Sequence, residues 1–377
     1  MTRKNSCLLL FFLAILLLGI IFSPQINASA RAMGFVFQII PSSPVRPLEW
    51  LTPQPIYEEV SFYQSGDKGI ADIYRPNDDD VHAGVILFLG VNPAGNNDPR
   101  VVRLAEGLAR TGLVVMIPWS DSMKEFVIDP GEIDNLVYAF QYLSSLSYVD
   151  PERLGMGGFC VGASISVVAA QDERIKEAVK FVNFFGGYYD ARDLLISVAS
   201  NTRFYGAGEK HWMHSDMSHQ VLINHLLDNV QDFEERMLLE QHFLMTDRQV
   251  PLHMSELSEN GNIVYKLLDE PSLSEARDLL DRLPQQFRDD LLTVSPSNHI
   301  GDLQSQMFIM HDFNDSNVPS EESRRLYNSL DKENGVHYSE FLLFDHMDPD
   351  RSLGFVVWSK EVWKLYVHLY QIMKISY

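Results

Sequence analysis

Residues 153–164 read Arg-Leu-Gly-Met-Gly-Gly-Phe-Cys-Val-Gly-Ala-Ser, and this stretch decides the fold. The apolar residues before the glycines predict a buried strand, and the small apolar residues from 161 to 170 predict a buried helix. Between them, Gly157, Gly158 and Gly162 remove side chains where strand and helix come close together. The pattern therefore predicts a strand, a very tight turn and a helix, with Cys160 at the corner.

The glycines on either side of Cys160 form a G-x-C-x-G pattern, which is typical of a nucleophile elbow with cysteine in place of serine. A helix that begins at the next residue points its N-terminus at the thiol, and the helix dipole favours the reactive thiolate. The alternative is a glycine-rich turn that holds a small buried cysteine. The remainder of the chain favours the first interpretation.

Apolar strands alternate with helical patterns along most of the chain. The expected strands are residues 57–63, 69–75, 84–90, 113–117, 178–185, 306–310 and 338–344, and the expected helices are residues 99–110, 132–146, 320–330 and 356–370. Continuous apolar runs such as residues 84–90 suit parallel strands that are buried on both faces. The alternation predicts an α/β fold with a mostly parallel central sheet and helices on both faces.

The pattern changes between residues 191 and 300, where polar helical stretches such as residues 222–240 replace the buried strands. We interpret residues 191–300 as a helical cap inserted into an α/β domain formed by residues 57–190 and 301–377. A cap at this position would shape a pocket over the functional edge of the sheet and exclude water from it.

The N-terminal sequence predicts an export signal. Basic residues precede an apolar run at residues 7–22, and the small residues Ala28-Ser-Ala30 follow it. Both cleavage near Arg31 and retention as a membrane anchor fit residues 1–30, and either outcome places the body of the chain outside the cytoplasm. Residues 31–56, which contain several prolines and no clear period, are expected to be a surface linker.

Composition limits the partners of the chain. A formal net charge of −21 over 377 residues argues against nucleic acid and anionic lipid surfaces as partners, so membrane contact is expected only through the N-terminal segment. The two cysteines are Cys7 and Cys160. If the signal is removed, Cys160 has no partner for an internal disulfide, and catalysis is one reason to keep a free thiol in an exported protein.

A nucleophile requires a base and a group that orients this base. Two loops supply them, because Asp315 lies in the loop after the strand at 306–310 and His346 lies after the strand at 338–344. The order nucleophile, acid, histidine is that of the α/β-hydrolase fold. Both loops leave the carboxyl ends of strands, so the three side chains are expected to meet at one edge of the sheet.

Other residues compete for these roles. Asp312 stands directly after its strand, where the fold usually has glycine, and His337 precedes the last strand and so lies at the wrong end of the sheet. Asp345 and Asp348 flank His346 and are expected to be solvated loop acids.

The insertion holds further candidates for binding. Four histidines, His211, His214, His219 and His225, cluster there without cysteines or dense carboxylates, which favours solvated or packed side chains over a metal site. The aromatic residues Tyr188, Tyr189 and Trp212 could line a pocket, but packing is the simpler role.

The chain resembles the α/β hydrolases and, within them, the dienelactone hydrolase family. The resemblance rests on Gly-Phe-Cys-Val-Gly at residues 158–162, the Asp-x-x-Val-Pro loop at residues 315–319 and His346, and it covers residues 57–190 and 303–370. The His-Gly pair that the family has before its oxyanion loop is Leu89-Gly90 here.

The resemblance implies hydrolysis of an ester, lactone or thioester through a covalent acyl-cysteine on Cys160. His346 would act as the base, Asp315 would orient its imidazole, and the backbone N–H groups of Val91 and Val161 would bind the oxyanion. No cofactor or metal is expected. Acyl transfer by the same residues, or a non-catalytic binding protein with this fold, remain the alternatives.

Overall fold

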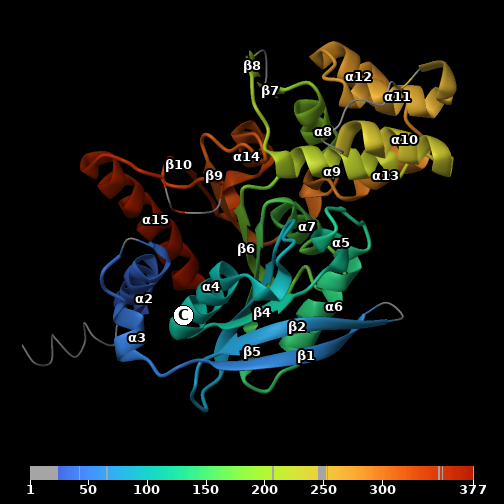
Figure 1. Cartoon of the computed structure of the whole chain (residues 1–377). Coiled ribbons are helices and arrows are strands. Elements are labelled where there is room, and N and C mark those ends of the chain that lie inside the picture. Colours follow the sequence, from blue (N-terminus) through green and yellow to red (C-terminus); the bar gives the residue numbers. More distant parts are fainter. Residues whose placement is uncertain are drawn as a thin grey trace, which may run out of the picture.

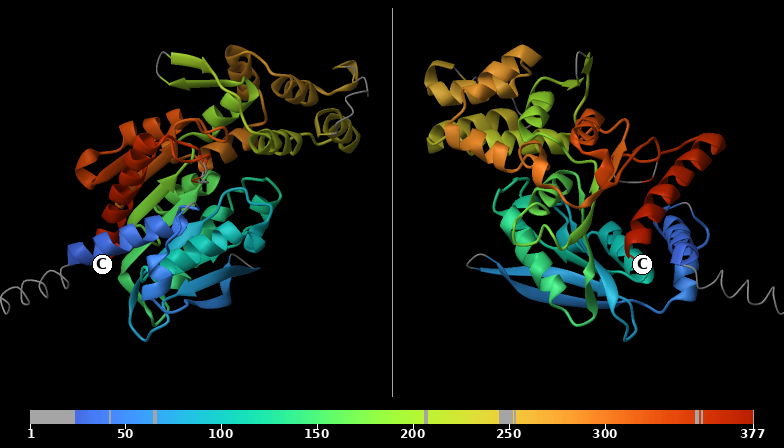
Figure 2. Two further views of the ribbon diagram at one scale, coloured as in Figure 1. Left: turned by 60° about the vertical axis from the view of Figure 1, so that its left-hand side comes forward. Right: turned by 180° about the vertical axis from the view of Figure 1, so that it is seen from behind.

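The computed structural model describes residues 24–376, apart from residues 42, 65–66, 206–207, 245–251, 253, 347–348 and 350. A central sheet lies between two layers of helices, and a separate group of helices covers one end of it (Figures 1 and 2). The helices that cover this end come from the predicted cap.

The central sheet has eight strands in the order β1-β2-β4-β3-β5-β6-β9-β10. The pairs β1–β2 and β2–β4 are antiparallel, and all other neighbours are parallel. The strands are β1 (Ile56–Gln64), β2 (Asp67–Arg75), β3 (His82–Phe88), β4 (Val114–Pro118), β5 (Val149–Phe159), β6 (Val179–Phe185), β9 (Gln306–Asp312) and β10 (Val336–Phe341). This topology confirms the predicted mostly parallel sheet of an α/β-hydrolase fold.

Helices cover both faces of the sheet, because each face is apolar and must be shielded from water. One face packs against α2 (Pro24–Ile39), α4 (Pro99–Arg110) and α15 (Phe355–Ser376), and the other packs against α6 (Glu132–Ser144), α7 (Val161–Ala169) and α14 (Ser320–Ser329). The short helices α3 (Pro47–Leu51) and α5 (Asp121–Lys124) lie in connections. Every residue of α7 is buried, as the small apolar residues after Cys160 predict.

The insertion is mostly helical. Its elements are α8 (Ala191–Ala199), β7 (Thr202–Tyr205), β8 (Gly208–His211), α9 (Asp216–Leu227), α10 (Phe233–Leu244), α11 (Glu259–Leu268), α12 (Leu273–Asp281) and α13 (Gln285–Thr293). The hairpin β7–β8 was not predicted, because its residues are exposed or half-buried and lack an apolar pattern. The helical stretch predicted at residues 222–240 is divided between two helices: α9 ends at Leu227, and Asp232 accepts a hydrogen bond from the N–H of Glu235 at the start of α10.

The prediction of a surface linker at residues 31–56 is wrong. Residues 24–39 form α2, whose face with Phe35 and Val36 is buried against α15, and the hydroxyl groups of Ser29 and Tyr366 lie 2.8 Å apart. This helix was not predicted because its apolar side chains pack against α15, more than 300 residues later in the chain. Cleavage before Arg31 would remove the first seven residues of α2.

No helix among the described residues is both long and apolar enough to span a membrane. The apolar run at residues 7–22, on which the prediction of a signal or anchor rests, lies outside the described residues.

Candidate active site

Cys160 stands at the turn between β5 and α7 with a strained backbone, at φ 54° and ψ −136°. Its N–H donates to the carbonyl of Phe185 at the end of β6, which fixes the turn. The flanking glycines are sterically required. A Cβ on Gly158 would lie 2.4 Å from the Cα of Ala163, and a Cβ on Gly162 would lie 2.5 Å from the carbonyl oxygen of Phe88. The strand therefore turns into the helix in a space that excludes any side chain.

Asp315 and His346 meet beside this turn, as the chain order predicts. The Nδ1 of His346 lies 2.7 Å from Oδ2 of Asp315, and both residues are buried. A Cβ on Gly186, at the end of β6, would lie 3.5 Å from Asp315 Oδ2 and 3.5 Å from His346 Cε1. Because Gly186 has φ 66°, a conformation that favours glycine, it leaves room for the pair.

The loop after β9 holds the Asp315 carboxylate in its charged form. Oδ1 accepts the N–H groups of Asn317, at 2.7 Å, and Val318, at 3.1 Å, while Nε2 of His311 lies 3.4 Å from Oδ2. Burial raises the pKa of Asp315, but the charge of His346 and the hydrogen bonds from His311 and His346 outweigh it. The pKa therefore lies well below its usual range, and Asp315 is ionised at neutral pH.

The surroundings of His346 favour its protonated form. Burial lowers its pKa, but the charges of Asp315 and Cys160 raise it more, so the pKa lies well above its ordinary value. Nδ1 faces Asp315. Nε2 is buried, and no described residue lies in a suitable position to form a hydrogen bond with it. This second nitrogen is the one that can exchange a proton with the thiol or with water.

The predicted oxyanion donors, Val91 and Val161, lie beside Cys160 and line a small cavity with it. A Cβ on Gly90, next to Val91, would lie 2.8 Å from the Cβ of Cys160, so the β3 loop touches the elbow. Among the described residues, neither the Val91 nor the Val161 N–H donates to a backbone carbonyl.

The cavity over Cys160 is small. Its volume is about 20 Å³, which is room for a single water molecule. Apolar side chains of α8 and α9, among them Leu194, Val198 and Val221, form its roof.

The cap is hydrogen-bonded to the loop that carries Asp315. The carbonyls of residues 315–317 accept hydrogen bonds from Trp212 Nε1 at 2.8 Å, the backbone N–H of Ser215 at 2.7 Å and Oγ of Ser218 at 2.9 Å. Trp212 lines neither described cavity, so it positions the acid loop instead of forming a pocket wall. The sequence carried no signal for this contact, because the partners are about 100 residues apart.

The competing residues have other contacts. Arg351 binds both carboxylate oxygens of Asp312 at 3.0 Å and also contacts the exposed Asp345, so Asp312 anchors the loop that carries His346. Burial raises the pKa of Asp312. His337 stacks on Phe308 near the start of β10, away from the elbow. Asp348 lies outside the described residues.

The histidines of the insertion do not gather around one point. His214 stacks on His219, and Nε2 of His225 accepts the N–H of Ile128. No group of three or more His, Cys, Asp or Glu side chains that could hold a metal ion occurs within the part of the chain that is described.

Two buried residues were missed. His311 bridges Oγ of Ser323, 2.5 Å from its Nδ1, and the carbonyl of Val318, 2.9 Å from its Nε2, behind Asp315. Glu322 accepts the N–H groups at the start of the cap, from Tyr189 and from residue 190, at 2.9 and 3.0 Å. His311 directly follows a predicted strand and could have been found from the sequence, whereas Glu322 resembles any helical surface acid.

One protein-family model matches part of the chain. Residues 122–243 match the model of the dienelactone hydrolase family, a stretch that contains the elbow and the first part of the cap. The chain has an α/β-hydrolase fold and resembles this family over that stretch. The match runs past residue 190, which we expected to be its boundary, through α8 and α9 into α10. The loops of Asp315 and His346 lie outside it. No curated protein matches the chain in sequence.

Solved structures of several hydrolases are similar to the chain. An acylaminoacyl peptidase from Pyrococcus horikoshii is 14% identical with a TM-score of 0.47, and the match covers 79% of this chain and 39% of that one. An esterase from Pyrobaculum calidifontis is 13% identical with a TM-score of 0.46, covering 86% and 85%. A 2,6-dihydroxy-pseudo-oxynicotine hydrolase is 13% identical with a TM-score of 0.49, covering 84% and 68%. The chain spans about two-fifths of the length of the peptidase.

Proposed function

We propose that this α/β hydrolase cleaves an ester, lactone or thioester through an acyl-cysteine on Cys160. The observation that carries the proposal is the buried pair of Asp315 and His346 beside a cysteine at a strained elbow. An imidazole with a raised pKa stabilises a neighbouring thiolate, which is the nucleophilic form of cysteine.

The proposed reaction has two steps. In the first, the thiolate of Cys160 attacks the substrate carbonyl, the N–H groups of Val91 and Val161 bind the oxyanion, and protonated His346 gives its proton to the leaving group. In the second, neutral His346 takes a proton from water, the resulting hydroxide attacks the thioester, and the carboxylic acid leaves while thiolate and imidazolium are restored. Asp315 keeps the proton of Nδ1 in place and stabilises the imidazolium in both steps.

Water is the acceptor that we favour over an alcohol or amine. The cavity at Cys160 has room for one water molecule when the cap is closed, whereas a larger acceptor would have to enter after the first product has left. Apolar roof residues also support a substrate whose acyl group is short or apolar. A non-catalytic binding role is less well supported, because it leaves the strained elbow and the buried acid–histidine pair unexplained.

A panel of p-nitrophenyl esters and alkyl thioesters with acyl chains of two to eight carbons tests this proposal. Wild-type protein should turn over the shorter members, and Cys160→Ala should abolish turnover while its circular dichroism is unchanged. Free carboxylic acid should be the product even when ethanol is present at high concentration. Turnover by Cys160→Ala would refute the nucleophile, and ester formation as the main product would indicate acyl transfer.

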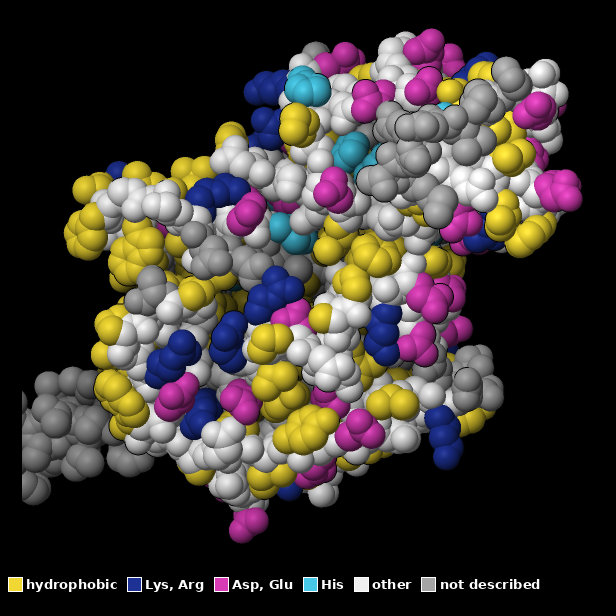
Figure 3. Space-filling view, in the orientation of Figure 1, with side chains coloured by type: hydrophobic (Ala, Val, Ile, Leu, Met, Phe, Trp, Pro, Cys, Tyr) yellow, Lys and Arg dark blue, Asp and Glu magenta, His cyan; other side chains and the backbone are white. Residues whose placement is uncertain are grey.

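We also propose that the N-terminal segment directs export and remains as a membrane anchor. Its apolar run ends at residue 22, and α2, which starts at Pro24 and crosses the predicted cleavage position, is packed into the domain. Exposed hydrophobic side chains gather along the neighbouring helices α3 and α15 (Figure 3). They include Trp50, Leu51, Phe355 and Trp363. Exposed aromatic residues of this kind suit the interface of a bilayer.

A further inference from the structure

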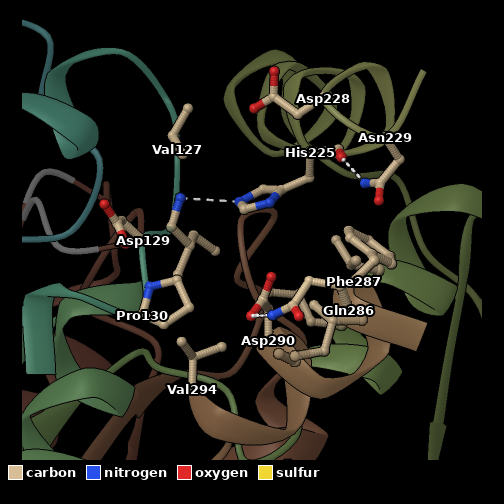
Figure 4. A pocket seen from close by; sticks show the side chains of 15 residues that line it. Val127, Asp129, Pro130, His225, Asp228, Asn229, Gln286, Phe287, Asp290 and Val294 are labelled. Carbon is tan, nitrogen blue, oxygen red and sulfur yellow. Dashed lines mark hydrogen bonds between the residues drawn. The ribbon is translucent and has the colours of Figure 1, made fainter. Parts of the chain in front are cut away.

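A second and larger cavity lies between the cap and the core. It has a volume of about 330 Å³, which is within the range of small-molecule sites. Its walls come from α8, α9 and α13 of the cap and from residues 127–130 of the core, which follow α5 (Figure 4). The proposed catalytic mechanism does not use any of its polar side chains.

This cavity adjoins the one over Cys160. Leu194 and Leu195 of α8 line both cavities. On α9, Val221 lines the small cavity, and His225, one helical turn later on the same face, lines the large one. The two cavities therefore share lining residues and lie along the same boundary between cap and core.

The imidazole of His225 offers a hydrogen-bond donor to the cavity. Its Nε2 accepts the N–H of Ile128 at 2.9 Å, so the proton of the neutral ring is on Nδ1. Burial lowers the pKa of His225 to about 4, although Asp228 and Asp290 raise it, and the ring is neutral at pH 7. Figure 4 shows the carboxylate of Asp290 below this ring, with both side chains pointing into the cavity.

The charge of the cavity is negative. Asp228 at its wall is paired with Arg236 at 2.7 Å, but no Lys or Arg among the described residues forms an ion pair with Asp290 or Asp129. Asp290 accepts a hydrogen bond from Gln286 at 2.8 Å, which leaves capacity on both carboxylate oxygens. Apolar side chains such as Phe287 line the same cavity. A carboxylate in such a setting gains most from a cation that brings its own apolar stem.

We propose that this cavity binds the ammonium group of a substrate that has an apolar stem, with Asp290 as the counter-ion. The stem would run along Leu194 and Leu195 toward Cys160 and place the reacting carbonyl there. The inference rests on the proposed hydrolase function and narrows its substrates to esters or thioesters that carry a primary or secondary amine some carbons away from the carbonyl.

Binding is tested first, in Cys160→Ala, so that no turnover is needed. Titration calorimetry compares n-pentylammonium with 1-pentanol, which has the same stem and no charge. The ammonium is expected to bind at least tenfold more tightly than the alcohol, and Asp290→Asn is expected to remove this preference. Asp289→Asn is the matched control, because Asp289 is exposed on the same helix and accepts an equivalent bond from Gln285. It should leave the preference unchanged.

Turnover is tested second, with pairs of thioesters whose acyl chains end in either an ammonium or a methyl group. The wild type should prefer the ammonium member at least tenfold in kcat/KM, and Asp290→Asn should bring the two to similar values. Equal affinity for pentylammonium and pentanol, or equal effects of the two aspartate substitutions, would overturn the inference. Selective ammonium binding together with no hydrolysis of any thioester would instead overturn the proposed function and leave the cation site standing.

Discussion

Gly162→Ala tests whether the proposed oxyanion site depends on the close approach of β3 and α7. Helix propensity alone predicts that alanine at this position stabilises the helix by up to about 1 kcal/mol. The structure predicts the reverse, because the new Cβ would lie 2.5 Å from the carbonyl oxygen of Phe88 and 2.7 Å from the carbonyl carbon of Leu89. Ordinary contacts begin near 3.4 Å, so the two backbone segments must separate by about 0.9 Å.

This separation would move the N–H groups of Val91 and Val161 apart, because Val91 follows Leu89 by two residues and Val161 directly precedes Gly162. A hydrogen bond of about 2.9 Å that lengthens by this amount is lost. Losing one oxyanion donor raises the barrier by about 3 kcal/mol, which is roughly a 100-fold decrease in kcat. KM should change little, since the oxyanion forms only during the reaction.

The assay measures kcat and KM with a short-chain thioester, together with circular dichroism and the rate of Cys160 alkylation by iodoacetamide. Folded protein with a reactive thiol and strongly reduced kcat is the expected result. Gly301→Ala serves as the control, because a Cβ at this position has no neighbour within 4 Å. A folded Gly162→Ala enzyme whose kcat stays within a few-fold of the wild type would refute the reasoning.

Four further predictions follow from the contacts around the site. Asp315→Asn should lower kcat at least 100-fold more than Asp312→Asn, because Asp315 alone contacts His346 and Asp312 binds Arg351; equal losses would reassign the acid. Trp212→Phe keeps an aromatic ring but removes the hydrogen-bond donor to the carbonyl of residue 315. We expect kcat to fall about tenfold, while the order of preference among acyl-chain lengths is unchanged. A changed order of preference would show that Trp212 contacts the substrate. Burial raises the pKa of Glu322 from 4.5 to about 7, so its contribution to stability is present below pH 4.5 and is lost as pH rises to 7. In urea unfolding, the free energy of unfolding of the wild type should therefore fall by up to roughly 3 kcal/mol between pH 4.5 and 7, relative to that of Glu322→Gln. If the free energies of both proteins change equally with pH, burial does not raise the pKa of Glu322. Finally, mass spectrometry of the membrane fraction should find an uncleaved N-terminus, whereas a mature chain that starts at Arg31 would show that α2 is cut.

The sequence predicted the parts of the fold that depend on local patterns. Buried strands such as β3 and β4 consist of continuous apolar runs, and the glycines around Cys160 are required by contacts within the same turn. The meeting of Asp315 and His346 was also predictable, because parallel strands bring their carboxyl ends to one edge. The sequence did not show that Asp312 contacts Arg351 while Asp315 contacts His346, because these contacts depend on loop geometry.

Long-range packing was not predictable. The helix α2 is buried only because α15, at the other end of the chain, covers its apolar side. The cap contacts the loop of Asp315 through a hydrogen bond from Trp212 to a backbone carbonyl. Every residue has such a carbonyl, so the sequence does not show which one accepts the bond. The role of Glu322 likewise depends on N–H groups that begin the cap, about 130 residues earlier.

The central claim is that an acyl group becomes attached to Cys160 during turnover. Rapid acid quenching of the enzyme with a short-chain thioester, followed by intact-protein and peptide mass spectrometry, tests it directly. We predict that the peptide containing Cys160 gains the mass of the acyl group during turnover and loses it once the substrate is consumed. Cys160→Ala should show neither the adduct nor turnover. Undiminished turnover by Cys160→Ala, or an acyl group attached to another residue, would contradict the account.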